Sequence, residues 1–101
     1  MTQSSLNQVS EAKILADAMK WLKQQPNLKP LRICDMYNKG YADIFICVNG
    51  KFVCAELKRA KGRLTPHQVR FLEDMEKVGA IVGVCRSVED VRALVERAST
   101  K

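Results

Sequence analysis

The chain has 101 residues, of which 47% are hydrophobic and 28% are charged, with 5 glycines and 3 prolines. This length suffices for one packed domain but not for two, and the composition excludes a fibrous or disordered protein. We therefore expect a single domain over residues 1–101.

The chain is basic. Lys and Arg number 17 against 11 Asp and Glu, which gives a formal net charge of +6 and a pI near 9.4. This balance favours a polyanionic partner such as nucleic acid, although anionic lipid or simple solubility would also explain it. The charge alone does not choose between these interpretations.

The cysteines and the N-terminal segment bear on the cellular compartment. No C-x-x-C pair is present and the chain has one histidine, so a zinc site is not expected. Each cysteine stands in an apolar stretch, which predicts buried, reduced thiols at Cys34, Cys47, Cys54 and Cys85. The sequence shows neither a signal-peptide pattern nor a run of about eighteen apolar residues, so the cytoplasm is the expected location.

The N-terminal third predicts a helix, a short strand and a turn. Apolar residues recur at helical spacing over residues 10–25, and Pro26 ends the pattern. Glu11 falls in the first turn of this helix. Residues 31–34 are a strand candidate after a linker over residues 26–30, and the Asn-Lys-Gly segment at 38–40 predicts a turn.

A β-hairpin is predicted next. Residues 41–48 and 51–58 are rich in β-forming side chains, and Asn49-Gly50 separates them. This dipeptide supports the positive φ angles of a type I′ turn.

The C-terminal part predicts a helix, a strand and a second helix. Thr65 as N-cap, Pro66 at the first helical position and Gln68 at the third begin a helix that runs to about Val78. Residues 80–85 form a fully apolar run of the kind found in buried strands, and a last helix begins after Ser87 and ends near Ala98.

The predicted order is therefore α-β-β-β-α-β-α. The helix from Pro66 must carry the chain across the sheet, so that the last strand is parallel to the second arm of the hairpin. We expect an α/β domain with a mixed four-stranded sheet flanked by helices.

The hairpin register brings two acids together. Val48 faces Lys51 in a two-residue hairpin, so partner numbers sum to 99 and Asp43 lies opposite Glu56. Alternation along the strand places Lys58 on the same face as Glu56. Like charges at this spacing destabilise a sheet, and a divalent cation such as Mg²⁺ or Mn²⁺ would offset them.

Simpler interpretations exist for each residue. Asp43 alone suits a turn, and Glu56 alone suits a solvated strand face. Taken together, these residues argue against the simpler interpretations, because Glu56 interrupts an apolar stretch in a strand that should be largely buried. Gln68 fits a capping box as well as a water- or phosphate-binding role, and Glu11 fits a first-turn acid as well as a metal ligand.

Three segments together resemble a known family. They are Gly40 to Asp43, Glu56 to Lys58, and the stretch G-R-L-T-P-H-Q over residues 62–68. In this order they resemble the virus-type replication-repair nuclease (VRR-NUC) family of the PD-(D/E)XK superfamily, over about residues 8–98. Ala42 departs from the pattern, because the superfamily often has proline there.

The resemblance implies a restriction-endonuclease-like core and an endodeoxyribonuclease that depends on Mg²⁺ or Mn²⁺. By position, Asp43 and Glu56 resemble the metal ligands, and Lys58 resembles the catalytic lysine. Gln68 resembles the helix glutamine, and Glu11 resembles the first-helix acid, which would join the metal site.

Stand-alone members of this length resemble Holliday-junction resolvases, which implies DNA repair or recombination in a bacterial or phage-infected cell. Our leading hypothesis is a homodimer acting on branched DNA, since two strands are cut symmetrically by two-fold-related sites. Flap or duplex DNA as substrate, a catalytically silent DNA-binding subunit and a ligand-free interaction domain are the alternatives. The predicted DNA contacts are Lys39, Arg59, Lys61 and Arg63.

Overall fold

The computed structural model describes residues 9–100. Residues 1–8, on which part of the expectation about targeting rests, and residue 101 lie outside this range. The elements are α2 (Glu11–Leu22), β1 (Leu28–Arg32), β2 (Ile44–Val48), β3 (Lys51–Leu57), α3 (Pro66–Lys77), β4 (Ile81–Cys85) and α4 (Val88–Ser99). No helix in this part of the chain is long and apolar enough to cross a membrane.

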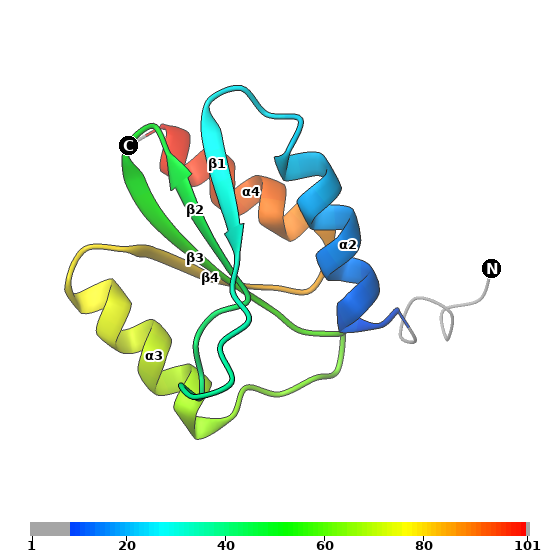
Figure 1. Ribbon diagram of the computed structural model, residues 1–101, viewed down its shortest axis with the longest axis vertical. Coiled ribbons are helices and arrows are strands. Elements are labelled where there is room, and N and C mark those ends of the chain that lie inside the picture. The colour runs from blue at the N-terminus through cyan, green and yellow to red at the C-terminus, as the bar shows by residue number, and fades with distance from the viewer. Residues whose placement is uncertain (1–8, 101) are drawn as a thin grey trace.

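The four strands form one sheet in the order β1-β2-β3-β4. The first three are antiparallel neighbours, and β4 pairs with β3 in parallel. Figure 1 shows the helices flanking this sheet. The predicted α/β fold with a mixed four-stranded sheet is confirmed.

Two apolar clusters lie on opposite faces of the sheet. The larger one joins Val53, Ala55 and Leu57 of β3 to buried residues of α2 and α4. The smaller one lies under α3 and contains Cys54 and Leu72. Successive β3 side chains therefore alternate between the two clusters, as the predicted strand periodicity requires.

The hairpin has the predicted turn and register. Asn49 and Gly50 adopt φ angles of 50° and 84°, as a type I′ turn requires. Pairing runs from Val48 opposite Lys51 to Ile44 opposite Ala55, so every pair sums to 99.

The predicted helix signals are confirmed as well. The Thr65 hydroxyl accepts a hydrogen bond from Gln68 N at 3.2 Å, and Gln68 Oε1 accepts one from Thr65 N at 2.9 Å. Ser87 caps α4 by accepting a hydrogen bond from Asp90 N. The capping box fixes the start of α3 beside the loop that precedes β2.

Two strands differ from the prediction by more than one residue at a boundary. β1 occupies residues 28–32 rather than 31–34, and it includes Pro30. Ile33 N donates to Asp43 O, so by alternation the Pro30 nitrogen points away from β2 at the sheet edge, where proline is tolerated. β2 begins at Ile44 rather than Tyr41, because the Tyr41 ring packs against Phe71 of α3 at 4.8 Å.

The prediction of four buried cysteines is wrong for two of them. Cys54 and Cys85 are buried, whereas Cys34 and Cys47 are exposed. Cys47 is an exposed residue of β2 that α3 does not cover. Cys34 lies in the loop that follows β1. An apolar stretch therefore did not reveal which face of the strand was covered.

Candidate active site

The centre of the site is a buried carboxylate on β3. Glu56 is 1% exposed and stands opposite Val84 of the parallel strand β4. Its Oε1 atom has no hydrogen-bond partner among the described residues. A buried carboxylate with an unpartnered oxygen is costly to folding, so a ligand is the usual reason for keeping one.

Asp43 supplies the second carboxylate, directly before β2. Its Oδ2 accepts a hydrogen bond from Leu57 N at 2.7 Å, which holds the side chain against the end of β3. The position is one step beyond the last paired residues, Ile44 and Ala55. The structure thus brings Asp43 and Glu56 together, as the hairpin register predicted.

The environment of Glu56 disfavours its charged form. Burial, followed by the negative charge of Asp43 and a hydrogen bond with it, raises the pKa of Glu56 to about 8. Glu11 adds a smaller effect in the same direction, and Lys58 opposes it. Without a cation, this pair of acids therefore holds a proton at neutral pH.

Lys58 follows β3 and is itself buried, with 8% of its surface exposed. Its backbone N donates to Cys85 O at 3.0 Å, which fixes the residue at the end of both central strands. Within residues 9–100 the ion pairs are Lys13–Asp17 and Arg70–Asp74, so the ammonium group is not neutralised by a close carboxylate. It remains available to an anionic ligand.

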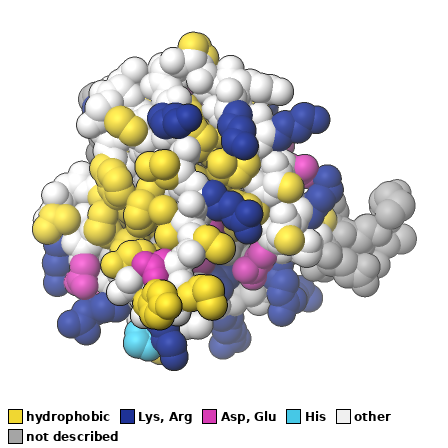
Figure 2. Space-filling model, viewed as in Figure 1, with side chains coloured by type: hydrophobic (Ala, Val, Ile, Leu, Met, Phe, Trp, Pro, Cys, Tyr) yellow, Lys and Arg dark blue, Asp and Glu magenta, His cyan; other side chains and the backbone are white. Residues whose placement is uncertain are grey.

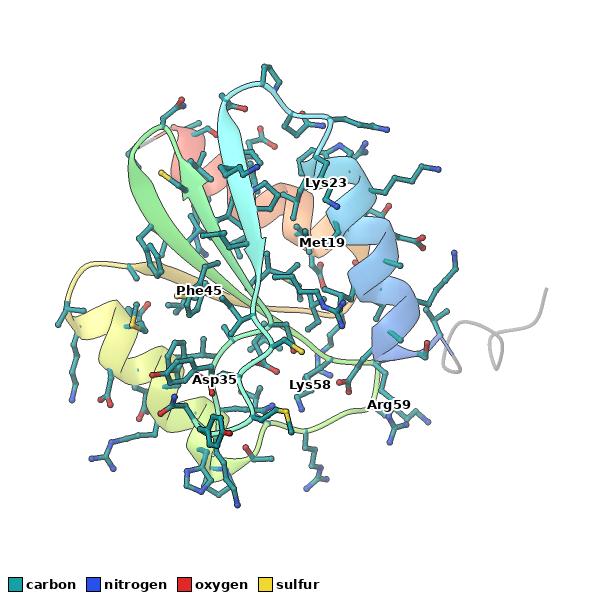
Figure 3. All side chains as sticks on the ribbon, in the orientation of Figure 1. Met19, Lys23, Asp35, Phe45, Lys58 and Arg59 are labelled. Carbon is teal, nitrogen blue, oxygen red and sulfur yellow. The ribbon has the colours of Figure 1, made fainter. Side chains whose placement is uncertain are left out.

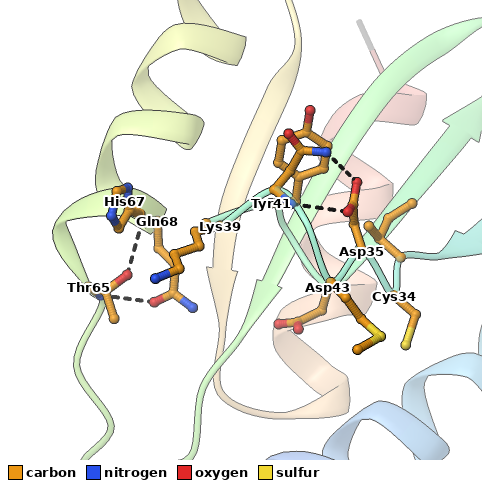
Figure 4. A pocket seen from close by; sticks show the side chains of 12 residues that line it. Cys34, Asp35, Lys39, Tyr41, Asp43, Thr65, His67 and Gln68 are labelled. Atoms are coloured by element: carbon orange, nitrogen blue, oxygen red, sulfur yellow. Dashed lines mark hydrogen bonds between the residues drawn. The ribbon is translucent and has the colours of Figure 1, made fainter.

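An open cleft of about 460 Å³ leads to this region. Asp43 lines it, together with Lys39 from the preceding loop and Thr65, His67 and Gln68 from the start of α3. Figure 4 shows the Gln68 amide oxygen bonded to Thr65, with the amide nitrogen on the side of Asp43. The capping role of Gln68 is therefore present and leaves its nitrogen free for a ligand in the cleft.

The third predicted acid lies farther out. Glu11 begins α2, and its Oε2 atom lies 3.4 Å from where a Cβ on Gly62 would stand. Within residues 9–100, no three His, Cys, Asp or Glu side chains gather closely enough to hold a metal ion. The structure therefore joins Asp43 and Glu56 tightly, and places Glu11 at longer range.

This pair of acids fits a divalent cation. Mg²⁺ is usually bound through one or two protein carboxylates together with water and substrate phosphate. The unpartnered Oε1 of Glu56 and the adjacent Asp43 carboxylate are hard oxygen donors of this kind. A cation would replace the proton that the pair holds in its absence.

Comparisons with known proteins place the fold. No family model and no curated protein matches the sequence. A solved structure described as a VRR_NUC domain protein is similar with a TM-score of 0.73 at 17% identity, covering 87% of this chain and 86% of the other. Another, described as a VRR_NUC domain, has a TM-score of 0.72 at 22% identity and covers 87% of this chain and 97% of the other.

The chain has the fold of a VRR-NUC domain. The predicted restriction-endonuclease-like core is thereby confirmed. Both similarities extend over most of each chain.

The chain carries a basic loop between β3 and α3. Arg59, Lys61 and Arg63 are all exposed on this loop, which follows the buried Lys58. Figure 3 shows Arg59 extending outward beside Lys58. In Figure 2 basic side chains also surround the lower edge of the molecule, beside the single histidine. These positions suit contacts with a phosphate backbone.

The structure reveals an anchor for this loop that the sequence did not indicate. Arg86 Nη1 donates to Arg59 O at 2.8 Å, to Ala60 O at 3.3 Å and to Gly62 O at 2.8 Å. Arg86 follows β4, more than twenty residues away along the chain. No local pattern could have predicted this contact, because it depends on the crossover that brings β4 beside β3.

We expect Arg86→Ala to loosen the basic loop. Without the guanidinium group, three carbonyl groups lose their common donor, and amide hydrogen exchange over residues 59–63 should accelerate at least about ten-fold. DNA affinity should fall by about three- to ten-fold because the basic side chains are no longer held in place.

Arg92→Ala is the matched control. Arg92 of α4 lies over the Trp21 ring of α2, so its removal takes away one positive charge without touching the loop. Equal losses of DNA affinity in both variants would show that only net charge matters and would contradict the anchoring role of Arg86.

Proposed function

We propose that this protein is a metal-dependent endonuclease that hydrolyses phosphodiester bonds in DNA. The observation that carries the proposal is the buried Glu56 carboxylate, which has an unpartnered oxygen and lies beside Asp43. The VRR-NUC fold supports the proposal, and so does a basic surface suited to a polyanion.

Each residue of the site has a role in this proposal. Asp43 and Glu56 would hold Mg²⁺ or Mn²⁺, with Glu11 as a more distant acid. When bound, the cation would supply Lewis acidity toward a phosphate oxygen and lower the pKa of water. The Lys58 ammonium would stabilise negative charge developing on the phosphate, and the free Gln68 nitrogen would orient water or a phosphate oxygen.

Binding of the DNA backbone is assigned to the basic residues around the site. Lys39 lines the cleft, and the exposed side chains of Arg59, Lys61 and Arg63 lie on the loop after Lys58. Contacts of this type position a duplex without reading its sequence.

We further propose branched DNA, such as a Holliday junction, as the substrate in repair or recombination. A chain of 101 residues offers little surface with which to grip a duplex. A homodimer would provide more surface and two active sites related by a two-fold axis, one for each strand.

Cleavage assays test the proposal. Labelled four-way junction, flap and linear duplex would be incubated with Mg²⁺, Mn²⁺ or a chelator. We expect cation-dependent cleavage that falls by about 10²–10³-fold or more in Asp43→Asn, Glu56→Gln and Lys58→Met. Mapping the product ends on each strand shows whether the cuts are paired.

Glu73→Gln and Lys77→Met are matched controls, because both residues are exposed on α3 away from the acids. They should cleave as the wild type does. Tight DNA binding without cleavage of any substrate by either metal would overturn the nuclease proposal in favour of a silent binding subunit.

A further inference from the structure

The loop between β1 and β2 exposes two large apolar side chains, one in the cleft and the other adjacent to it in the chain. Met36 is 91% exposed and Tyr37 is 95% exposed, more than any other large apolar residue in the described part of the chain. Met36 also lines the cleft that Asp43 and Gln68 share. Exposed apolar groups beside a functional cleft indicate a contact with a ligand.

Hydrogen bonds order this loop. Asp35 Oδ1 accepts from Tyr37 N at 2.9 Å. Asp35 also accepts from Asn38, through Oδ1 from the backbone N at 3.1 Å and through Oδ2 from Nδ2 at 2.7 Å (Figure 4). These bonds lower the pKa of Asp35, which keeps its carboxylate charged and bonded to the loop. The Asp35 carboxylate therefore holds the tip of the loop, residues 36–38, in one conformation.

The base of the loop is packed against α3. Gly40 has a φ of 85°, and a Cβ at this position would lie 2.4 Å from the His67 carbonyl oxygen. This close approach ties the loop to the start of the helix, where Gln68 reaches the cleft. Tyr37 lies between Met36 and Asn38, which both line the cleft that contains Asp43.

The chemistry around the tip favours a nucleic acid over a protein. Lys39 belongs to the same loop and lines the same cleft, which offers a positive charge for a phosphate. An exposed aromatic ring beside such a charge is the arrangement on which single-stranded bases stack. Bases inside a continuous duplex are already stacked on their neighbours, so the matching ligand is an unpaired base.

We propose that Tyr37 stacks on an unpaired nucleobase next to the phosphate that is cut. The substrate class is then DNA with unpaired nucleotides at the cleavage position, as at a branch or bulge. This inference rests on the proposed nuclease function and specifies its substrate.

The test uses the wild type, Tyr37→Ala and Tyr37→Phe. One oligonucleotide duplex carries 2-aminopurine at an unpaired position, and its partner is the same duplex fully paired. Fluorescence is measured with Ca²⁺, and cleavage of both DNAs is measured with Mg²⁺. Val78→Ala is the control, because Val78 is 80% exposed and lies outside the cleft.

The wild type, Tyr37→Phe and Val78→Ala should quench the fluorescence and prefer the unpaired substrate. Tyr37→Ala should lose the quenching and about ten-fold of the cleavage rate on the unpaired substrate, with its rate on paired duplex unchanged. The phenylalanine variant should behave as wild type because stacking does not require the hydroxyl group.

Three results would overturn the inference. They are an equal loss on both DNAs in Tyr37→Ala, a Tyr37→Phe variant that fails as Tyr37→Ala does, and a changed oligomeric state in Tyr37→Ala by light scattering. The last would assign the tip to a contact between copies of the chain. If the wild type cuts no DNA, the nuclease proposal fails, while the fluorescence measurement still decides the base contact.

Discussion

In the absence of divalent cations, Glu56→Gln should be more stable than the wild type at pH 8.5, by about 2–5 kcal/mol in the free energy of unfolding. Glutamine has nearly the shape of a protonated glutamic acid and carries no charge. It therefore removes the cost of burying a carboxylate that is 1% exposed and lies beside Asp43. Urea denaturation in a chelator measures the difference.

The sign of the pH dependence follows from the pKa values. The pKa of Glu56 rises from an ordinary 4.5 to about 8 in the folded protein. The folded state thus binds more protons than the unfolded state between these values, and the stability of the wild type falls as the pH rises through this window. Below about pH 4.5 the contribution is fully present, and above about pH 8 it is lost.

The variants separate this effect from general acid stability. Glu56→Gln should lose the slope between pH 4.5 and 8, whereas Glu73→Gln on the surface of α3 should keep it. Mg²⁺ at pH 8.5 should stabilise the wild type but not Glu56→Gln, because the variant loses one of the two carboxylates of the proposed cation site. The same slope in both variants would show that Glu56 is not the group that titrates.

Gly40→Ala should destabilise the protein by about 2–4 kcal/mol and impair the cleft. The residue has a φ of 85°, and an added Cβ would meet the carbonyl oxygen and carbon of His67 at 2.4 and 2.5 Å. These are backbone atoms at the start of α3, so they cannot move aside as a flexible side chain would. The loop that lines the cleft must shift instead.

Gly50→Ala provides a matched comparison. Gly50 has a φ of 84°, and a Cβ at that position would have no neighbour within 4 Å. Both variants therefore carry the same left-handed backbone penalty of roughly 1 kcal/mol, and the clash with His67 is present only at Gly40. Thermal unfolding with equal losses in the two variants would contradict the close packing of the loop against α3.

Local patterns predicted the parts of the site that depend on neighbouring residues. Asn49-Gly50 and the strand alternation sufficed to place Asp43 opposite Glu56, because a two-residue turn leaves one register. The capping box similarly placed Gln68 at the start of α3. These features are determined within a few residues of chain.

Other parts depend on tertiary packing and were not predicted. The sequence predicts a linker at Pro30, because it does not show that β1 is an edge strand with its outward nitrogen free. Cys47 is exposed because α3 does not extend over it, and the sequence does not show how much of the sheet the helix covers. Arg86 reaches a loop far away along the chain, and no spacing rule anticipates such a contact.

The order of the strands along the chain also determines when the site forms during protein synthesis. The two acids belong to one hairpin, and Asp43 accepts its hydrogen bond from Leu57 N, only 14 residues along the chain. The strand that covers Glu56 and binds the Lys58 backbone, however, begins at Ile81. A nascent chain that has emerged from the ribosome only as far as Gly79 therefore holds both carboxylates without the strand beside Glu56, and a closed site forms only after β4 has been made and has paired with β3.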